Sequence, residues 1–248
     1  MKISVQLYTV REDMDRDAAA TLSALSDMGF RYVETAGYAG RSVDEFAELL
    51  KGRNLKVSGM HVGLTEAESS MDRLLEEATI LDSPYIIVPW VSEADYADGF
   101  GPLAARLEAV GQIVREAGRV FAYHNHVFEF LEHNGEVGYD VIFSQTSADS
   151  VVNQIDLWWA HCGGRDVPEM IDVFGERVRL VHLKDGCECD SPVQIEAGLG
   201  VMVWDPILRA CDRVGVDFGV IELDNCPNPP IESVRQSLEF FRSKGYLD

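Results

Sequence analysis

The sequence is poor in cysteine and has no long apolar run, and both shortages exclude classes of protein. Its five cysteines, an odd number, show no CxxC spacing. This pattern argues against a disulfide framework or a zinc ribbon, so we expect free thiols, including Cys187 and Cys189 on either side of Glu188 in a predicted loop. Every apolar run is shorter than the roughly 18 residues that a membrane span needs.

Positive charge is also scarce. The chain carries 42 acidic and 21 basic residues, which gives a net charge of −21, and only five of the basic residues are lysines. Nucleic acids and anionic membranes are bound by clustered lysine and arginine, so we expect neither partner and attribute the charge to a well-solvated acidic surface. The N-terminal stretch MKISVQLYTV lacks the apolar core of a signal peptide, which predicts a cytoplasmic protein.

Hydrophobic periodicity and turn signals predict strands and helices in strict alternation. The predicted strands are 3–8, 32–35, 56–60, 85–88, 119–125, 151–157, 178–184 and 217–223. The predicted helices are 17–28, 70–81, 102–117, 139–144, 167–174 and 204–214, with two more that begin at 42 and 229. Gly29 has the position of a C-capping glycine, and Ser42 with Glu45 forms the pattern of a capping box.

This alternation indicates right-handed crossovers and a parallel sheet. Eight strand–helix units in 248 residues match the usual size of a (β/α)8 barrel, so we predict a single TIM-barrel domain over residues 1–248. A doubly wound open sheet is the alternative. It usually has a glycine-rich turn after the first strand, and this sequence has none.

The last two predicted strands place reactive side chains on one face. In the seventh strand His182 and Lys184 follow Leu180 at alternate positions, and in the eighth strand Glu222 follows Val220. Each face begins apolar and turns polar toward the C-terminal end of the strand, which is where barrel enzymes hold their catalytic groups. The sequence therefore predicts an active site in which His182 and Glu222 are neighbours.

The other predicted strands also end in polar or aromatic side chains. These are Gln6, Tyr8, Glu34, His61, Trp90, His124, His126, Gln154 and Asp156. Carboxylates at Asp156 and Glu222 would repel each other in a water-poor pocket unless a cation neutralised them. One histidine with two or three carboxylates suits a divalent ion, so we expect Asp156, His182 and Glu222 to bind one Mn²⁺, Co²⁺, Mg²⁺ or Zn²⁺.

The fourth ligand of this predicted metal site is ambiguous. In the stretch YHNHVFEF, His124 and His126 are predicted to face the barrel interior, and Glu129 can fold back from the following loop. We favour Glu129 as the ligand, because a carboxylate balances the charge of the cation better. The two histidines then serve as acid–base groups or substrate contacts, and His124 as the ligand is the alternative.

Six segments in order, QLYTVRE, YHNHVFEF, IDLWW, RLVHLKD, GLGVMVWDPIL and VIELD, resemble the xylose isomerase-like TIM-barrel superfamily, in its branch of sugar phosphate isomerases and epimerases. The resemblance covers essentially the whole chain and implies a divalent metal held by Asp156, His182 and Glu222. Many members carry Glu where this sequence has His124, and His where it has Trp159. The second difference and the acidic charge argue against a DNA-repair role like that of endonuclease IV.

The resemblance implies a metal-dependent sugar isomerase or epimerase that abstracts a proton next to a metal-chelated carbonyl/hydroxyl pair. Glu222 or Glu129 is the expected base, His124 or His126 returns the proton, and Lys184 neutralises the developing oxyanion. The residues expected to bind the substrate are Gln6, Glu34, His61, Trp90 and Trp159.

Two alternatives to an isomerase stay open. A dehydratase or lyase that acts on a keto-inositol or a 3-keto-glycoside starts with the same proton abstraction and then expels a leaving group. A non-catalytic sugar-binding barrel performs no chemistry. The expected partner is a small sugar or polyol, without support for a phosphate group because no Lys/Arg cluster stands at the strand ends. A homo-oligomer is compatible with the sequence.

Overall fold

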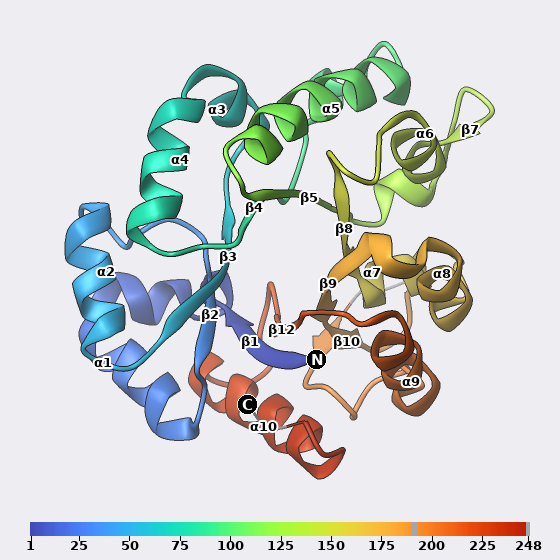
Figure 1. Cartoon of the computed structure of the whole chain (residues 1–248). Coiled ribbons are helices and arrows are strands. Elements are labelled where there is room, and N and C mark those ends of the chain that lie inside the picture. Colours follow the sequence, from blue (N-terminus) through green and yellow to red (C-terminus); the bar gives the residue numbers. More distant parts are fainter. Residues whose placement is uncertain (190–192, 247–248) are drawn as a thin grey trace.

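A closed barrel of eight parallel strands occupies the centre of the protein (Figure 1). The computed structural model describes residues 1–189 and 193–246. Around the barrel the strands follow the order β1-β12-β9-β8-β5-β4-β3-β2. They are β1 (Lys2–Gln6), β2 (Tyr32–Thr35), β3 (Lys56–His61), β4 (Tyr85–Val88), β5 (Val120–His124), β8 (Val152–Asp156), β9 (Val178–Leu183) and β12 (Phe218–Ile221).

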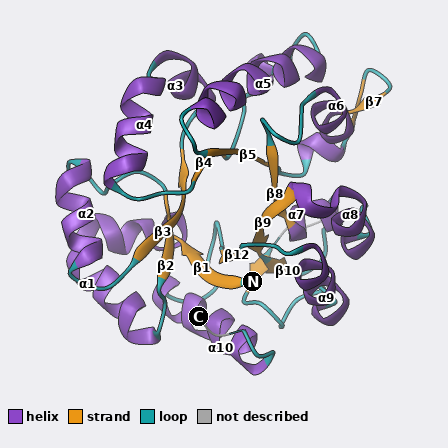
Figure 2. Ribbon diagram, viewed as in Figure 1, coloured by secondary structure: helices purple, strands orange, loops and turns teal. Residues whose placement is uncertain are grey.

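Helices surround the barrel on its outer side (Figure 2). They are α1 (Arg11–Met28), α2 (Val43–Lys51), α3 (Leu64–Ser69), α4 (Met71–Ile80), α5 (Phe100–Glu116), α6 (Gly138–Gln145), α7 (Leu157–Cys162), α8 (Val167–Phe174), α9 (Trp204–Val214) and α10 (Pro230–Ser243). The prediction of a (β/α)8 barrel is confirmed, and every predicted barrel strand is present with small shifts at its ends.

The helices differ from the prediction at three places. The first helix begins at Arg11 rather than at residue 17, and Asp17 bends it there with non-helical backbone angles while its carboxylate accepts a hydrogen bond from the N–H of Ala20. The short α3 precedes the helix predicted over 70–81. The short α7 directly follows β8, where only a strand end was predicted.

The predicted helix caps are confirmed. Gly29 ends α1 with a φ of 108°, a left-handed conformation that favours glycine. Ser42 begins α2 with a capping box, in which its hydroxyl accepts from the N–H of Glu45 and the Glu45 carboxylate accepts from the N–H of Ser42. These local signals therefore fix the end of α1 and the start of α2, on either side of β2.

Alternation along the strands divides the apolar side chains into two layers. Leu180 of β9 and Val220 of β12 belong to a small buried cluster inside the barrel, as the sequence predicted. Val181 and Ile221, one residue further along, belong to the large cluster between strands and helices. The strands thus alternate inward and outward up to their C-terminal ends, where the inward positions become polar.

Two small hairpins lie in the loops that follow β5 and β9. The first pairs β6 (Glu132–His133) with β7 (Glu136–Val137), and the second pairs β10 (Asp185–Gly186) with β11 (Gln194–Ile195). A disulfide joins Cys162 at the end of α7 to Cys189 in the loop after β9. The expectation of free thiols was wrong for Cys162 and Cys189, because the two lie 27 residues apart and no local spacing marks the pair. Cys187 is free and exposed.

A single buried carboxylate organises the loop between β9 and α9. Asp185 is 1% exposed and accepts five hydrogen bonds. The donors are the N–H groups of Gly186, Gly198, Gly200 and Met202 and the indole N–H of Trp204. Five donors compensate the burial of one negative charge, so the described residues that surround Asp185 are held together by one carboxylate.

The glycines in the segment GLGVM make this arrangement possible. Gly198 has a φ of 85°, which a residue with a side chain rarely adopts. A Cβ atom at Gly200 would overlap the carboxylate of Asp185 and the carbonyl oxygen of Gly186. The two glycines therefore allow the backbone to close around Asp185.

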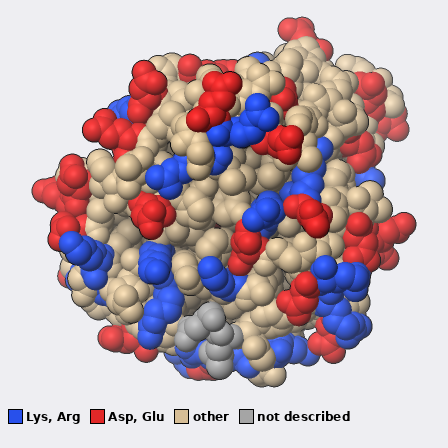
Figure 3. Space-filling model, in the orientation of Figure 1, with Lys and Arg blue, Asp and Glu red and all other residues tan. Residues whose placement is uncertain are grey.

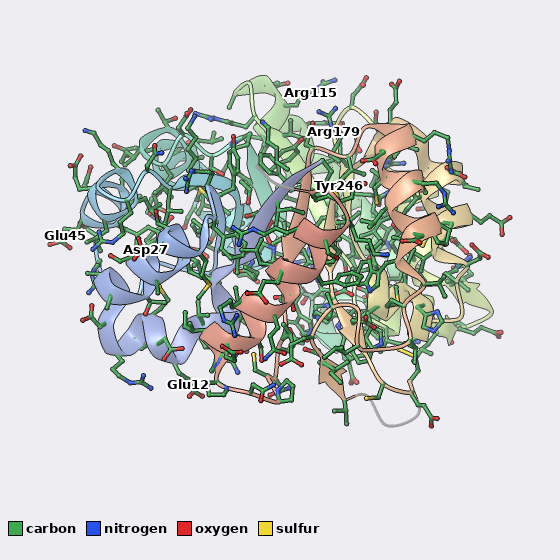
Figure 4. All side chains as sticks on the ribbon, turned by 90° about the horizontal axis from the view of Figure 1, so that it is seen from below. Glu12, Asp27, Glu45, Arg115, Arg179 and Tyr246 are labelled. Carbon is green, nitrogen blue, oxygen red and sulfur yellow. A yellow bond between two sulfur atoms is a disulfide. The ribbon has the colours of Figure 1, made fainter. Side chains whose placement is uncertain are left out.

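The two ends of the barrel can be recognised in a side view. Arg179 near the start of β9 and Glu12 in the first turn of α1 lie toward opposite ends of the molecule (Figure 4). Because only the short 3-10 helix Leu7–Val10 separates β1 from α1, the end that carries Glu12 is the one to which the strands point. On the face drawn in Figure 3, acidic and basic side chains are interspersed. Within the described ranges, no helix has both the length and the apolar character needed to cross a bilayer.

We expect Asp185→Asn to lower the free energy of unfolding by at least about 2 kcal/mol, because an amide nitrogen cannot accept and leaves buried donors unpaired. Chemical denaturation followed by circular dichroism measures the change. Asp98→Asn, at an exposed position, is the control for loss of one charge and should change stability little. Equal stability of the two variants would contradict the role given to Asp185.

Candidate metal centre and active site

Four buried side chains converge at the C-terminal ends of neighbouring strands. His124 ends β5, Asp156 ends β8, His182 lies near the end of β9, and Glu222 directly follows β12. Each offers one ligand atom, and these atoms all lie within 4.8 Å of one another. The four strands are adjacent around the barrel, and their alternation points all four side chains inward. The cluster has the composition of a site for one divalent cation.

Backbone groups fix Asp156 at the end of β8. Its Oδ1 accepts hydrogen bonds from the N–H groups of Trp158 and Trp159, at 3.1 and 2.9 Å, so Asp156 is the N-cap of α7. Its own N–H donates to Oδ1 of Asn125. Its Oδ2 makes no hydrogen bond of good geometry to the described residues, although the Lys184 ammonium lies 3.0 Å away. Burial raises the pKa of Asp156, and the charge of Lys184 partly offsets this.

His182 lies between two carboxylates. Its Nε2 is 2.7 Å from Oε1 of Glu34, and its Nδ1 is 2.7 Å from Oε2 of Glu222. Burial by itself lowers the pKa of His182, but the charges of Glu222 and Glu34 raise it to about 10. Both ring nitrogens therefore carry protons in this arrangement, and a metal ion would take the place of one of them.

Glu34 is the centre of a polar network that the sequence did not predict. Its Oε1 accepts from the amide of Gln6 at 2.9 Å and lies 2.9 Å from Nε2 of His61, and its Oε2 accepts from the amide of Gln154 at 2.6 Å. Burial alone would raise the pKa of Glu34, but the charges of His61 and His182 hold it well below its usual range. Glu34 therefore connects the two imidazoles through one carboxylate.

Lys184 places an ammonium group among three carboxylates. Its Nζ lies 3.0 Å from Oδ2 of Asp156, 2.9 Å from Oε2 of Glu222 and 2.9 Å from Oδ2 of Asp224. The lysine is fully buried. Burial lowers the pKa of Lys184, but these carboxylates outweigh that effect and raise it well above its usual range. The same ammonium, with His182, keeps the pKa of Glu222 well below its ordinary value despite burial.

His124 completes the donor set as a neutral imidazole. Its Nε2 is 3.9 Å from Oδ2 of Asp156, and its Nδ1 is buried and makes no hydrogen bond to the described residues. Burial, and then the charge of His182, hold the pKa of His124 well below its usual value. Two imidazoles and two carboxylates are ligand types that a divalent metal ion accepts, and Nδ1 of His124 and Oδ2 of Asp156 have no hydrogen-bond partner among the described residues.

Glu129, which we favoured as the fourth ligand, lies outside this cluster. Its Oε1 accepts from the hydroxyl of Tyr123 and its Oε2 from the N–H of His126, both at 2.8 Å. Tyr123 belongs to the apolar layer between strands and helices, so the carboxylate is held on the outer side of β5. Burial raises the pKa of Glu129 to about 7. The geometry therefore favours the alternative ligand, His124.

A cavity of about 470 Å³ opens beside the four candidate ligands. Its lining residues are Tyr8, Ala36, His61, Val62, Gly63, Pro89, Trp90, His124, His126, Glu222 and Asp224. They include three histidines and two carboxylates, and among these described residues there is no lysine or arginine. Trp90 is 54% exposed at the rim. The wall of the cavity therefore combines acid–base groups with apolar side chains.

The residues expected to bind substrate divide between this cavity and the network below it. His61 and Trp90 line the cavity. Gln6 and Glu34 are fully buried and hydrogen-bonded to each other, and Trp159 packs with its ring centre 5.7 Å from the Lys184 ammonium. Gln6, Glu34 and Trp159 therefore contact other side chains of the site, namely His182 through Glu34 and Lys184 through Trp159.

Sequence reasoning left Gln154 and Asp224 without a role. The structure gives Gln154 hydrogen bonds to Glu34 and His61, and Asp224 an ion pair with Lys184. A signal for both was present, because each stands two residues from a predicted ligand and therefore on the same face of its strand. The contacts themselves join distant segments and carry no local pattern.

Two solved structures share the fold over nearly the full length of both chains. A protein from Parabacteroides distasonis ATCC 8503 described as a sugar phosphate isomerase/epimerase has a TM-score of 0.86 and 19% identity, and the match covers 100% of this chain and 95% of that one. The IOLI protein with a bound zinc atom has a TM-score of 0.75 and 15% identity, with 98% and 97% covered. At these identities the likeness concerns the fold alone.

Sequence comparison finds a curated relative and a family. The inosose dehydratase of Lacticaseibacillus casei is 22% identical over 204 residues, which cover 75% of this chain and 63% of the relative, so the chain spans less than two thirds of that protein. The model of the family described as "Xylose isomerase-like TIM barrel" matches residues 22–244. This match includes every candidate metal ligand and most of the chain, and the protein belongs to the xylose isomerase-like TIM-barrel family.

Proposed function

We propose that this protein is a metal-dependent isomerase or epimerase of a neutral sugar. The observation that carries the proposal is the position of the four buried candidate ligands, His124, Asp156, His182 and Glu222, beside a cavity of sugar-binding size. Family membership gives the same class of chemistry, because its members include sugar isomerases, epimerases and dehydratases.

In this proposal the four side chains hold one divalent ion, Mn²⁺, Co²⁺, Mg²⁺ or Zn²⁺. When bound, such an ion polarises a carbonyl group and makes the neighbouring C–H bond more acidic. All four ligands are buried and so shielded from bulk water, and His124 and Glu222 also line the cavity, where a substrate can reach them. It also sets the orientation of His182 through the carboxylate of Glu34, 2.7 Å from Nε2.

The side chains of the cavity wall supply the proton transfers. Glu222 lines the cavity and is charged, so it is our candidate for the base that takes the proton from carbon. His126 lines the same cavity and is our candidate for the group that returns a proton from another direction. The Lys184 ammonium, 2.9 Å from Glu222, supplies positive charge where negative charge develops on the substrate oxygen.

The lining of the cavity supports a substrate without a phosphate group in this proposal. Phosphate groups are recognised by arginine, lysine or backbone N–H groups at the start of a helix. The described lining residues contribute two carboxylates and no basic side chain other than histidine. A phosphorylated sugar would meet a negative wall, so we assign an unphosphorylated ketose, inosose or related polyol.

Dehydration of a keto-inositol or elimination from a 3-keto-glycoside is the second candidate. The cavity carries three histidines, His61, His124 and His126, and a reaction that expels a hydroxyl or glycoside oxygen needs an additional acid to protonate it. The mass of the product distinguishes the reactions, since isomerisation leaves it unchanged, dehydration removes one water, and elimination from a glycoside gives two fragments.

We expect about one divalent ion per chain in the purified protein, measured by elemental mass spectrometry, and its loss in His182→Ala. His124→Gln should lower the metal content at least tenfold, whereas Glu129→Gln should retain it, because Glu129 is bonded to Tyr123 on the outer side of β5. Retention by His124→Gln together with loss by Glu129→Gln would reverse the assignment of the fourth ligand.

We expect Glu222→Gln to keep its fold. The rate at which it replaces a substrate C–H hydrogen by solvent deuterium should fall at least 100-fold, because general-base catalysis typically contributes 10²- to 10⁴-fold. Proton NMR in D₂O with a panel of neutral ketoses and inososes measures the exchange. Glu76→Gln, at an exposed position on α4, is the matched control. Exchange in no member of the panel by the metal-loaded wild type would contradict the proposed function.

A further inference from the structure

The Lys184 ammonium lies beside the carboxylates of the candidate metal site. It lies within 3.0 Å of carboxylate oxygens of Asp156 and Glu222, and both of these residues are candidate metal ligands. A cation bound by the same oxygens would experience the repulsion of this ammonium at close range. Lysine and metal are therefore competitors for the same negative charge.

A third carboxylate gives the ammonium a second place to bind. Asp224 Oδ2 is 2.9 Å from the same Nζ, but Asp224 is not one of the four candidate ligands and its side chain is 26% exposed at the cavity. Gln194 in β11 fixes Asp224 from both sides, because its amide donates to the Asp224 carboxylate and its Oε1 accepts from the Asp224 N–H. Asp224 is thus a rigid anchor just outside the ligand set.

We propose that Lys184 is an internal cation that stabilises the carboxylates of the site before a metal binds, and that Asp224 retains its ammonium when a divalent ion takes over Asp156 and Glu222. The inference rests on the proposed metal site. It assigns to Lys184 and Asp224 the control of metal affinity, a role separate from any contact with the substrate.

The charges around the ammonium explain why the lysine can be buried at all. A buried ion needs several compensating partners, and Lys184 has three carboxylates around it. The aromatic ring of Trp159 covers a further side, with its centre 5.7 Å from Nζ. Removing the charged amine would leave Asp156 and Glu222 with less compensation, so a protein without it should be less stable and should attract a metal ion more strongly.

The test compares the binding of Mn²⁺ and Zn²⁺ to the full chain after treatment with a chelator, by isothermal titration calorimetry. We expect Lys184→Met to bind at least about tenfold more tightly than the wild type, because a close positive charge has been removed. The melting temperature of the same variant should be lower than that of the wild type without metal and should rise more when metal is added. Lys51→Met, which removes an exposed lysine, is the control and should change neither quantity.

Asp224→Asn is a second variant, and we expect it to change the metal affinity in the opposite direction. Without its anchor the ammonium stays with Asp156 and Glu222, so metal binding should weaken. Part of this loss comes from the removed negative charge alone, and the double variant with Lys184→Met isolates that part. If the anchor acts through Lys184, the loss caused by Asp224→Asn should be at least about fivefold larger in the wild type than in the Lys184→Met background.

The outcomes separate this inference from the proposed function. If the wild type binds metal and Lys184→Met binds it equally or more weakly, the lysine does not compete with the metal. The inference is then overturned and the metal site stands. Metal binding by Lys184→Met but not by the wild type would mean that the ammonium keeps the metal out completely, which is the strongest form of the competition. Absence of binding in both proteins at millimolar Mn²⁺ and Zn²⁺ would overturn the metal site and the inference together. If Lys184→Met does not fold, Lys184→Gln takes its place. If Asp224→Asn then changes the metal affinity of the wild type and of Lys184→Gln equally, the inference is overturned.

Discussion

Burial of negative charge at the C-terminal ends of the strands is the constraint on which the site depends. Glu34 and Asp156 are fully buried and Glu222 is 5% exposed, and an unpaired carboxylate in such a place would cost several kcal/mol. His182 and Lys184 provide the positive charge, and each lies between at least two of these carboxylates. The site is therefore a network in which two cations offset most, but not all, of the charge of three carboxylates, and a divalent ion that bound there would replace some of these ion pairs.

The barrel supplies the geometry for this network through alternation alone. Leu180 and Val220 fill the apolar interior, and two residues later on the same strands His182 and Glu222 lie at the polar end. Neutral amides on β1 and β8 bind Glu34 without adding charge, and the imidazoles of His61 and His182 are its other side-chain partners within hydrogen-bond distance among the described residues. One carboxylate thereby connects the cavity wall to a buried candidate ligand.

The sequence predicted what depends on local pattern and missed what depends on distant partners. The alternation of eight strands with eight helices predicted the barrel, and period-two alternation within two strands placed His182 and Glu222 together. The choice of Glu129 followed charge balance, but Tyr123, which alternates to the outer face, binds that carboxylate. The disulfide of Cys189 had no signal, because its partner lies on another element.

The segment after β9 shows why these distant contacts matter for the site. Asp185, the residue after Lys184, is fixed by five hydrogen bonds, so the backbone that carries the lysine has little freedom to move. The disulfide of Cys189 ties the same loop to α7, the helix whose first N–H groups hold Asp156. The ammonium and one of its carboxylates therefore belong to a single stiffened unit. Any change in their pairing has to come from rotation of the lysine side chain rather than from movement of the loop.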